Sequence, residues 1–426
     1  MVERLTKPLL KENGSYRPLS FNEAFQCVQQ KLAFTAPNKT LMMASGDYSN
    51  EELYMLQRLA RAGFRTNALG SLDYYRRGTD FFIDKNDIVP FAELFASDLL
   101  LCMLDENAHT ESAKSIRHII DNCKDAEKYD FNIPNHLQVT DYAPFFRALC
   151  WYLIHNDLAK GIYVNGLGKN YAEYKATILK ERIEDVLSPN KLTMSDVEMI
   201  IGKIRAAKAP AFVIWEPLLD ARAIIEVENL CMLLDIQAKP CSGFLTVKRD
   251  LNSQGLFDMG FFPQVCVGGI PFDPENRQLM CELYGCEVVT ENVNIVDELQ
   301  QRSFANCFVW NATGKMIADE IMEAVRNASF TVLQTAYWEG DETDFDLLLP
   351  ASLPAETEGS YTDSARIPHN SKPADPCPLE FSNLQMFSAL GCYFGLAQMT
   401  NTSDIFMEYI SFLRGGCRSK FRHFFR

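Results

Sequence analysis

Residues 346–363 read DLLLPASLPAETEGSYTD, and this stretch says more about the fold than any other part of the chain. Its first part, Asp346–Pro350, is an apolar run with the length and composition of a buried strand. Small residues and a second proline follow and predict a turn. The rest is acidic up to Gly359 and ends in Tyr361-Thr-Asp363. The segment therefore predicts a buried strand that leads into a polar loop containing a glycine.

Strands and helices alternate around this segment over the whole chain. Apolar runs predict strands at 41–45, 97–104, 211–215, 308–310 and 331–333, and helical patterns lie at 20–34, 50–62, 142–155, 194–207, 220–234 and 318–325. Ser20 and Glu23 have the spacing of a capping box at the first helix. A strand, a glycine turn and the helix from Asn50 form a βα unit, a geometry that phosphate-binding folds use. The alternation predicts an α/β fold with mostly parallel sheets, and residues 367–378, rich in proline, are expected to form a surface loop.

Length, charge and hydropathy exclude several classes of protein. At 426 residues the chain is long enough for two domains or more. The formal net charge of −15 argues against nucleic acid and anionic membranes as main partners. The sequence has no apolar run long enough for a transmembrane segment and no apolar signal core at its N-terminus, so we expect a cytoplasmic protein.

The cysteine spacing bears on metal clusters. Thirteen cysteines are scattered along the chain, the closest pair is Cys281 and Cys286, and no C-x-x-C motif occurs. Iron–sulfur clusters need several thiolates within a few residues of one another. We therefore expect no iron–sulfur cluster in this chain, no structural zinc, and mostly buried, reduced thiols.

The segment 346–363 resembles a signature of the molybdopterin oxidoreductase superfamily, the group that includes formate dehydrogenases and nitrate reductases. Leu5–Ala24, Gly46–Arg61, Ser188–Ile214 and Lys248–Arg277 are similar to further motifs of the family, and all of them occur in family order. The resemblance implies the central body of a formate dehydrogenase alpha subunit, or of the large peripheral subunit of complex I. The family's cluster-binding domain would precede this body, and its C-terminal β-barrel domain would follow it.

The resemblance also implies an architecture. It predicts two pseudo-symmetric α/β domains with mostly parallel sheets, one inserted in the other, as in the central domains of formate dehydrogenase and DMSO reductase. Residues 1–75 and 250–426 would form a discontinuous α/β domain. Residues 76–249 would form the inserted domain.

Candidate site residues follow from the same resemblance. Arg249 matches the family's active-site arginine if a one-residue gap follows it, and Asp141 stands in the motif that reads guanine. Four more residues stand in motifs on the expected pterin side: Asn252, Gln254, Thr362 and Asp363. If the chain binds a cofactor, the resemblance implies molybdopterin guanine dinucleotide at these residues.

The metal position departs from the family pattern. The turn Arg65–Asp73 is similar to the turn before the molybdenum or tungsten ligand, but no Cys, Ser or His stands at the ligand position after it. Asp73 or Asp80 could supply an oxygen ligand, although solvated carboxylates are the more common state in turns. We therefore predict no metal ligand.

The dinucleotide positions depart from the pattern as well. Carboxylates within Met103–Asn107 would repel a pyrophosphate. The loop Trp215–Leu218 lacks the glycines that let backbone approach phosphate. Asn311–Gly314 replaces another family loop, and the family's next strand is expected to be absent from 122–134.

Two functions remain open on these grounds, and whether the chain is an enzyme stays undecided between them. The first is a subunit with a degenerate site and a structural or docking role in an electron-transfer complex like formate dehydrogenase or NADH dehydrogenase, whose partner subunits carry the iron–sulfur clusters. The second is a catalytically competent, molybdopterin-binding oxidoreductase subunit that acts on formate or a similar small substrate with such partners. A stand-alone chaperone or storage homologue is a third possibility.

The C-terminal stretch Arg418–Arg426, RSKFRHFFR, differs in charge from the rest of the chain. It is basic and aromatic, whereas the chain as a whole is acidic. The sequence leaves two interpretations: a docking peptide for an acidic partner, or a frayed chain end.

Overall fold

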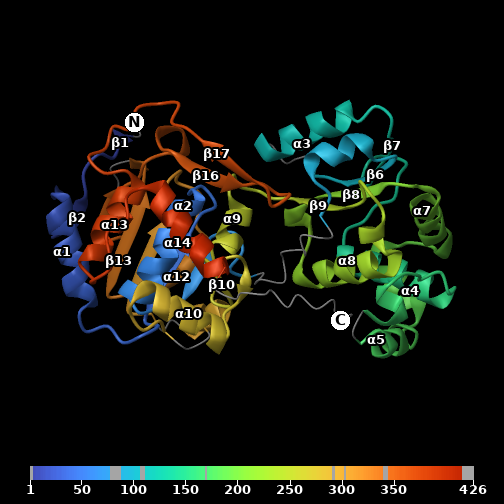
Figure 1. Ribbon diagram of the computed structural model, residues 1–426, viewed down its shortest axis with the longest axis horizontal. Helices are drawn as coiled ribbons and strands as arrows, with labels where there is room; N and C mark the ends of the chain where they lie inside the picture. Colours follow the sequence, from blue (N-terminus) through green and yellow to red (C-terminus); the bar gives the residue numbers. More distant parts are fainter. Residues whose placement is uncertain are drawn as a thin grey trace. The chain divides into compact units, whose positions relative to one another are not determined.

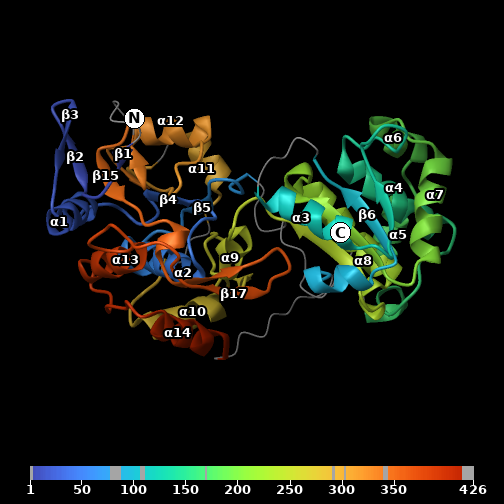
Figure 2. The same cartoon turned by 90° about the horizontal axis from the view of Figure 1, so that it is seen from above.

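A computed structural model gives the fold of most of the chain. It describes residues 3–76, 88–105, 111–167, 170–289, 293–301, 304–338 and 344–414. These residues form two compact units (Figures 1 and 2). The first unit contains the described residues up to Arg76, Asp250–Asp363, and those from Pro368 onward. The second contains the described residues from Ile88 to Arg249, together with Ser364–Ile367.

The first unit is built on a seven-stranded sheet with the order β3-β2-β15-β13-β12-β4-β5. Its strands are β2 (Leu9–Glu12), β3 (Ser15–Pro18), β4 (Thr40–Ala44), β5 (Leu69–Ser71), β12 (Asn306–Trp310), β13 (Phe330–Thr335) and β15 (Leu347–Pro350). The strands from β15 to β5 run parallel, and β2 and β3 add an antiparallel hairpin at one edge. Parallel strands are usually covered on both faces, which explains why every residue of β4 is buried.

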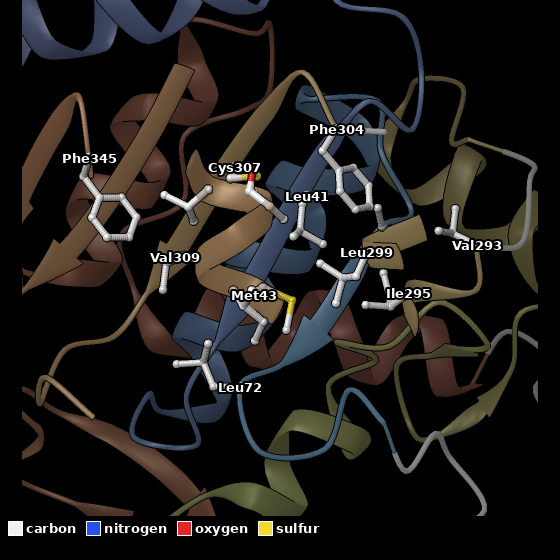
Figure 3. Close-up of a cluster of buried hydrophobic side chains, with 14 of the residues drawn as sticks. Leu41, Met43, Leu72, Val293, Ile295, Leu299, Phe304, Cys307, Val309 and Phe345 are labelled. Carbon is white, nitrogen blue, oxygen red and sulfur yellow. The ribbon is translucent and has the colours of Figure 1, made fainter. Parts of the chain in front are cut away.

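Helices cover both faces of this sheet (Figures 1 and 2). They are α1 (Phe21–Leu32), α2 (Asn50–Arg58), α9 (Ser253–Asp258), α10 (Pro274–Tyr284), α11 (Ile295–Gln301), α12 (Asp319–Asn327), α13 (Asn383–Cys392) and α14 (Thr402–Arg414). Successive side chains of a strand point to opposite faces. Val309 of β12 therefore joins the core that includes residues of α11 and α12 (Figure 3), whereas Trp310 packs edge-on against Phe387 of α13.

The second unit has a four-stranded, fully parallel sheet with the order β7-β6-β8-β9. Its strands are β6 (Leu99–Met103), β7 (Glu127–Asp130), β8 (Pro210–Trp215) and β9 (Gly243–Val247). Its helices are α3 (Glu111–Asn122), α4 (Tyr142–His155), α5 (Tyr171–Ile178), α6 (Ile183–Leu187), α7 (Met194–Ala206) and α8 (Ala221–Leu234). One face of the sheet packs Val213 and Leu245 into an aliphatic core, and the other stacks Phe212 on Phe244 with ring centroids 4.2 Å apart.

Three short antiparallel pairs complete the described structure. They are β1 (Glu3–Arg4) with β14 (Tyr337–Trp338), β10 (Val265–Cys266) with β11 (Ile270–Pro271), and β16 (Gly359–Thr362) with β17 (Pro368–Ser371). The segment 346–363 thus contains the buried strand β15, a turn, and β16.

The predicted alternation of strands and helices is confirmed, and two expectations are corrected. β7 lies within 122–134, where we expected no strand; it is an edge strand of partly exposed residues, so it has no apolar run to reveal it. β17 lies in the stretch expected to be a loop and begins with a proline at its first position, which edge strands tolerate. The helix predicted over 50–62 is confirmed: α2 runs to Arg58 and continues as a π-helical turn, Leu59–Gly63. No helix among the described residues is both long and apolar enough to cross a membrane.

Candidate functional site

The carboxyl ends of β4 and β12 lie side by side in the first unit, because the two strands are parallel neighbours. Open α/β sheets bind their ligands at this edge. The chain from Asp250 packs against the loop after β4, where Asn252 N–H donates to the Gly46 carbonyl at 2.7 Å. Only a glycine permits this approach, since a Cβ atom at position 46 would lie 2.9 Å from Asp250 Cβ.

Lys315, in the loop after β12, forms the centre of a charge cluster at this edge. Its Nζ lies 2.5 Å from Asp250 Oδ1 and 3.0 Å from Asp47 Oδ1. Asp47 Oδ2 accepts hydrogen bonds from the hydroxyls of Thr313, at 2.5 Å, and Ser45, at 3.1 Å. The Lys315 side chain is 24 % exposed and that of Asp250 is 5 % exposed, so the cluster is largely removed from solvent.

The pKa values in this cluster follow from burial and from the neighbouring charges. Burial raises the pKa of Asp250 to about 6; a hydrogen bond with Asp73 adds to the rise, and Lys315 opposes it. Burial by itself would lower the pKa of Lys315, but Asp250 and Asp47 hold that pKa above its ordinary value. Lys315 therefore stays protonated at neutral pH and its charge is shared by two carboxylates, whereas Asp250 can exchange a proton near pH 6.

Helix α2 begins beside this cluster with an acidic first turn. Ser49 caps the helix by accepting the Glu52 N–H, and Glu52 Oε2 accepts the Ser49 N–H at 2.8 Å. The Glu51 carboxylate accepts the backbone N–H and the hydroxyl of Ser360, both at 2.8 Å. Burial raises the pKa of Glu52 to about 7. The end of α2 at which a phosphate would bind is therefore occupied by the chain's own acceptors.

Asn252 and Thr362, two of the predicted cofactor contacts, meet in a buried hydrogen-bond network of the first unit. Asn252 Oδ1 accepts the Thr362 N–H at 2.7 Å, and Asn252 Nδ2 donates to the Tyr48 carbonyl at 2.8 Å and to Asn50 Oδ1 at 3.1 Å. The Thr362 hydroxyl and the Asn50 amide also bond, at 3.0 and 3.2 Å. The network ties α2, α9 and β16 together and uses the polar atoms of both side chains.

The two other predicted contacts in the first unit make local bonds. Gln254 is 2 % exposed, and its amide donates to Asp258 Oδ1 one turn further along α9, at 3.3 Å. Asp363 follows β16 and pairs with His369 Nε2 of β17 at 2.8 Å. Both side chains thus have a partner within their own element or hairpin.

The second unit has an ion pair at the corresponding place, the carboxyl ends of the parallel neighbours β8 and β9. Glu216 follows β8, Lys248 follows β9, and their side chains bond directly. The Glu216 side chain is fully buried and that of Lys248 is 3 % exposed. Sequence analysis missed this pair, although each partner comes directly after an apolar strand.

Arg249 and Asp141 are the predicted site residues of the second unit. Asp141 caps α4 by accepting the Ala143 N–H at 3.3 Å, and its carboxylate lies 3.7 Å from the Arg222 guanidinium. The Arg249 carbonyl accepts a hydrogen bond from the Ser112 hydroxyl at 3.4 Å. Of the six predicted residues, the structure brings Asn252 and Thr362 into direct hydrogen bonding.

The described residues bear on whether the chain can hold a metal ion. No group of three or more His, Cys, Asp or Glu side chains within them is arranged to hold a metal ion. Asp73, one of the two carboxylates considered as a ligand, hydrogen-bonds with Asp250. The other, Asp80, lies outside the described residues.

Comparisons with known proteins show which family the chain resembles. The sequence profile of the molybdopterin oxidoreductase family matches residues 4–102. Proteins named "Putative formate dehydrogenase" from Staphylococcus aureus (strain bovine RF122 / ET3-1) and Staphylococcus haemolyticus (strain JCSC1435) are 23 % identical over 405 residues and 22 % identical over 404 residues. The chain is thus similar to members of the molybdopterin oxidoreductase superfamily. Each match covers 85 % of this chain but only 40 % of the relative's length.

Two solved structures share the fold of this chain. Acetylene hydratase from Pelobacter acetylenicus superposes with a TM-score of 0.65 at 12 % identity, over 96 % of this chain and 64 % of its own. A chain of the formyltransferase/hydrolase complex (FhcABCD) from Methylorubrum extorquens, solved in complex with methylofuran, superposes with a TM-score of 0.57 at 9 % identity, over 91 % of this chain and 98 % of its own. These likenesses confirm the predicted fold class.

The similarity to this superfamily implies a molybdopterin cofactor, so we ask whether the residues of the first unit fit one. A pterin dinucleotide carries phosphates, which require cations or N–H donors. Here Lys315 is engaged by two carboxylates, and α2 begins with Glu51 and Glu52. The amides of Asn50 and Asn252 are bonded within the chain. These five side chains do not fit a dinucleotide, because they present carboxylates and satisfied amides where it needs cations and donors.

Proposed function

We propose that this chain is a structural and docking subunit of a multi-subunit complex of the formate dehydrogenase type, and that its cofactor site is degenerate. The observation that carries the proposal is Lys315 between Asp47 and Asp250, at the sheet edge where ligands of α/β proteins bind. The charged side chains at this edge are thus paired with one another. Largely buried ion pairs resist disruption, because separating them leaves an uncompensated charge.

Assembly with further chains is supported by the extent of one structural match. The FhcABCD chain is part of a complex, and nearly all of it and of the present chain superpose, at 98 % and 91 %. The formate dehydrogenase relatives are matched over 40 % of their length. In our proposal the chain works in the cytoplasm beside subunits that carry iron–sulfur clusters, and its folding domains are residues 1–75 with 250–426, and 76–249.

The competing function is a catalytically competent subunit that binds molybdopterin guanine dinucleotide and oxidises formate or a similar small substrate with iron–sulfur partners. The family match at 4–102 and the formate dehydrogenase relatives favour it. In that case Arg249 and the loop with Thr362 and Asp363 would line the site.

Elemental and pterin analysis of the complex purified from its native cells tests the proposal. We expect molybdenum and tungsten well below one atom per chain, and no pterin fluorescence after acid oxidation. A molybdenum enzyme purified from the same cells is the control for cofactor supply. Near-stoichiometric metal together with pterin would overturn the degenerate site in favour of the competing function. Iron and sulfide content of the same sample tests the iron–sulfur partners separately.

A further inference from the structure

The inner face of α14 is well packed against the first unit. The helix lies on α2 and α10 (Figure 2). Ile405 and Phe412 are buried. Glu408 accepts the Tyr54 hydroxyl at 2.7 Å, and its carboxylate lies 3.3 Å from the Arg58 guanidinium. Positions 405, 408 and 412 share one side of a helix, so these contacts fix which face of α14 is turned inward.

The outer face of α14 carries apolar side chains that remain in contact with solvent. Phe406 and Met407 are 45 % and 57 % exposed, and Ile410, one turn further on, is half-buried. Phe406 rests against the ring of Tyr409 of the same helix, with centroids 5.1 Å apart. Single exposed apolar residues are common on protein surfaces, but an apolar stripe along a helix normally packs against another element. We call Phe406, Met407 and Ile410 the outer stripe.

The segment that follows α14 has an apolar stripe of its own. Residues 415–426, GGCRSKFRHFFR, lie outside the described residues. Phe421, Phe424 and Phe425 have the spacing i, i+3, i+4, which places all three rings on one side of a helix. The other positions of 418–426 are polar, and four of them are Lys or Arg. As a helix, residues 418–426 are therefore amphipathic, with one aromatic side that needs a partner.

Residues 415–417 supply a connection of the right length for a helical hairpin. Gly415 and Gly416 follow α14, and glycine is the residue most often found directly after a helix. Antiparallel helices are commonly joined by loops of about two to five residues, and this connection has three. A connection this short holds the next segment beside α14 at a high effective concentration, which favours α14 of the same chain over that of another copy.

We propose that residues 418–426 form a short helix that folds back on α14 and covers the outer stripe. In an antiparallel hairpin centred on Gly416, residues equally distant from this glycine face each other. Position 425 then faces position 407, and position 421 faces position 411, beside Ile410. The three phenylalanine rings thus extend along the outer stripe, and both apolar faces leave water on contact, which is the main favourable term in such packing. The basic side chains of the segment keep their charged ends in water.

Hydrogen exchange of the full chain, followed by mass spectrometry, tests the hairpin without any substitution. Amides of residues 420–426 should exchange at least about tenfold more slowly than in a free peptide of the same sequence, because a docked helix protects its N–H groups. Removing residues 418–426 should in turn speed exchange in peptides that cover 405–412. Exchange of 420–426 at the rate of the free peptide would overturn the proposal.

Photo-crosslinking of the full chain locates the segment. p-Benzoylphenylalanine in place of Phe425 should crosslink to peptides containing residues 402–414, identified by mass spectrometry. Phe406→Glu puts a carboxylate into the outer stripe and should lower the yield about tenfold, since the contact would bury that charge. The matched control is Phe34→Glu, the same substitution at a fully exposed phenylalanine elsewhere in the first unit, which should leave the yield unchanged.

Mixing ¹⁴N- and ¹⁵N-labelled chains before irradiation separates the possible occupants of the outer stripe. In our proposal the crosslinks join residues of one isotope only. Crosslinks between isotopes would show that the segment of a second copy lies on α14, and crosslinks to another subunit would show that it binds a partner. Either result would overturn the proposal, as would crosslinks that map away from 402–414 or none at all.

Discussion

In both units, residues that follow the strands of a parallel sheet form ion pairs at its carboxyl edge. The ion pairs of the two units are buried to different depths. In the second unit, Glu216 and Lys248 follow adjacent parallel strands and are almost completely buried. In the first, Lys315 is 24 % exposed and is shared by Asp47 and Asp250. Desolvation makes a buried ion pair hard to break, whereas a pair near solvent is screened. The difference indicates that the pair in the second unit belongs to its core, while the cluster in the first can change its protonation.

Lys248→Met should have the largest effect, because it leaves the fully buried Glu216 carboxylate without its counter-charge. Removing one partner of a buried pair costs about 3–5 kcal/mol. Urea denaturation at pH 7, followed by circular dichroism, measures the free energy of unfolding. Lys248→Met/Glu216→Leu removes both charges and should recover most of the loss. A double variant as unstable as the single one would show that the ion pair is not the source.

Lys315→Met should lower the free energy of unfolding by about 2 kcal/mol at pH 8. This is less than for Lys248→Met, because Lys315 is partly exposed. The loss should shrink at pH 5. The pKa of Asp250 is raised to about 6, so below that pH its carboxyl is protonated and needs no counter-charge. Unfolding measured at both pH values checks this, with the exposed Lys372→Met as control. A loss that does not change with pH would contradict the proton exchange assigned to Asp250.

The fold was predictable because its central strands are continuous apolar runs. β4 and β8 are buried along their whole length, and such runs stand out in a sequence. β7 and β17 were missed because edge strands with exposed side chains have no such pattern. Their pairing depends on neighbours that are distant in sequence and become adjacent only when the sheet order is known.

The candidate site was predictable only in part. The family motifs contain Asn252 and Thr362, whose contact the structure shows. Lys315 and Lys248 were missed because their partners lie far along the chain and meet them only through strand order. The loop Trp215–Leu218, which contains Glu216, stands out in the sequence only because it lacks glycines. That absence does not indicate which residue carries the charge opposite to that of Glu216.

Glu52→Gln tests the acidic start of α2. Burial raises the pKa of Glu52 from 4.5 to about 7. A carboxyl whose folded pKa lies above its unfolded value holds its proton more tightly when folded, so its contribution to stability is lost as the pH rises from 4.5 towards 7. The substitution should therefore stabilise the chain by about 2 kcal/mol more at pH 8 than at pH 5. Thermal unfolding across this range checks it, and Glu380→Gln, an exposed acid, should show no such trend.

Arg222→Ala should have the smallest effect, and it separates the predicted site residue Asp141 from the buried pair in the same unit. The Arg222 and Asp141 side chains are 70 % and 39 % exposed and lie 3.7 Å apart, so water screens their attraction. We expect the free energy of unfolding to fall by less than about 0.5 kcal/mol for Arg222→Ala, compared with about 3–5 kcal/mol for Lys248→Met. Urea denaturation of both variants under one set of conditions gives the contrast. Arg222 also pairs with Asp220 at 2.7 Å, so a loss at Arg222 comparable with that at Lys248 would contradict the small contribution expected from these exposed ion pairs.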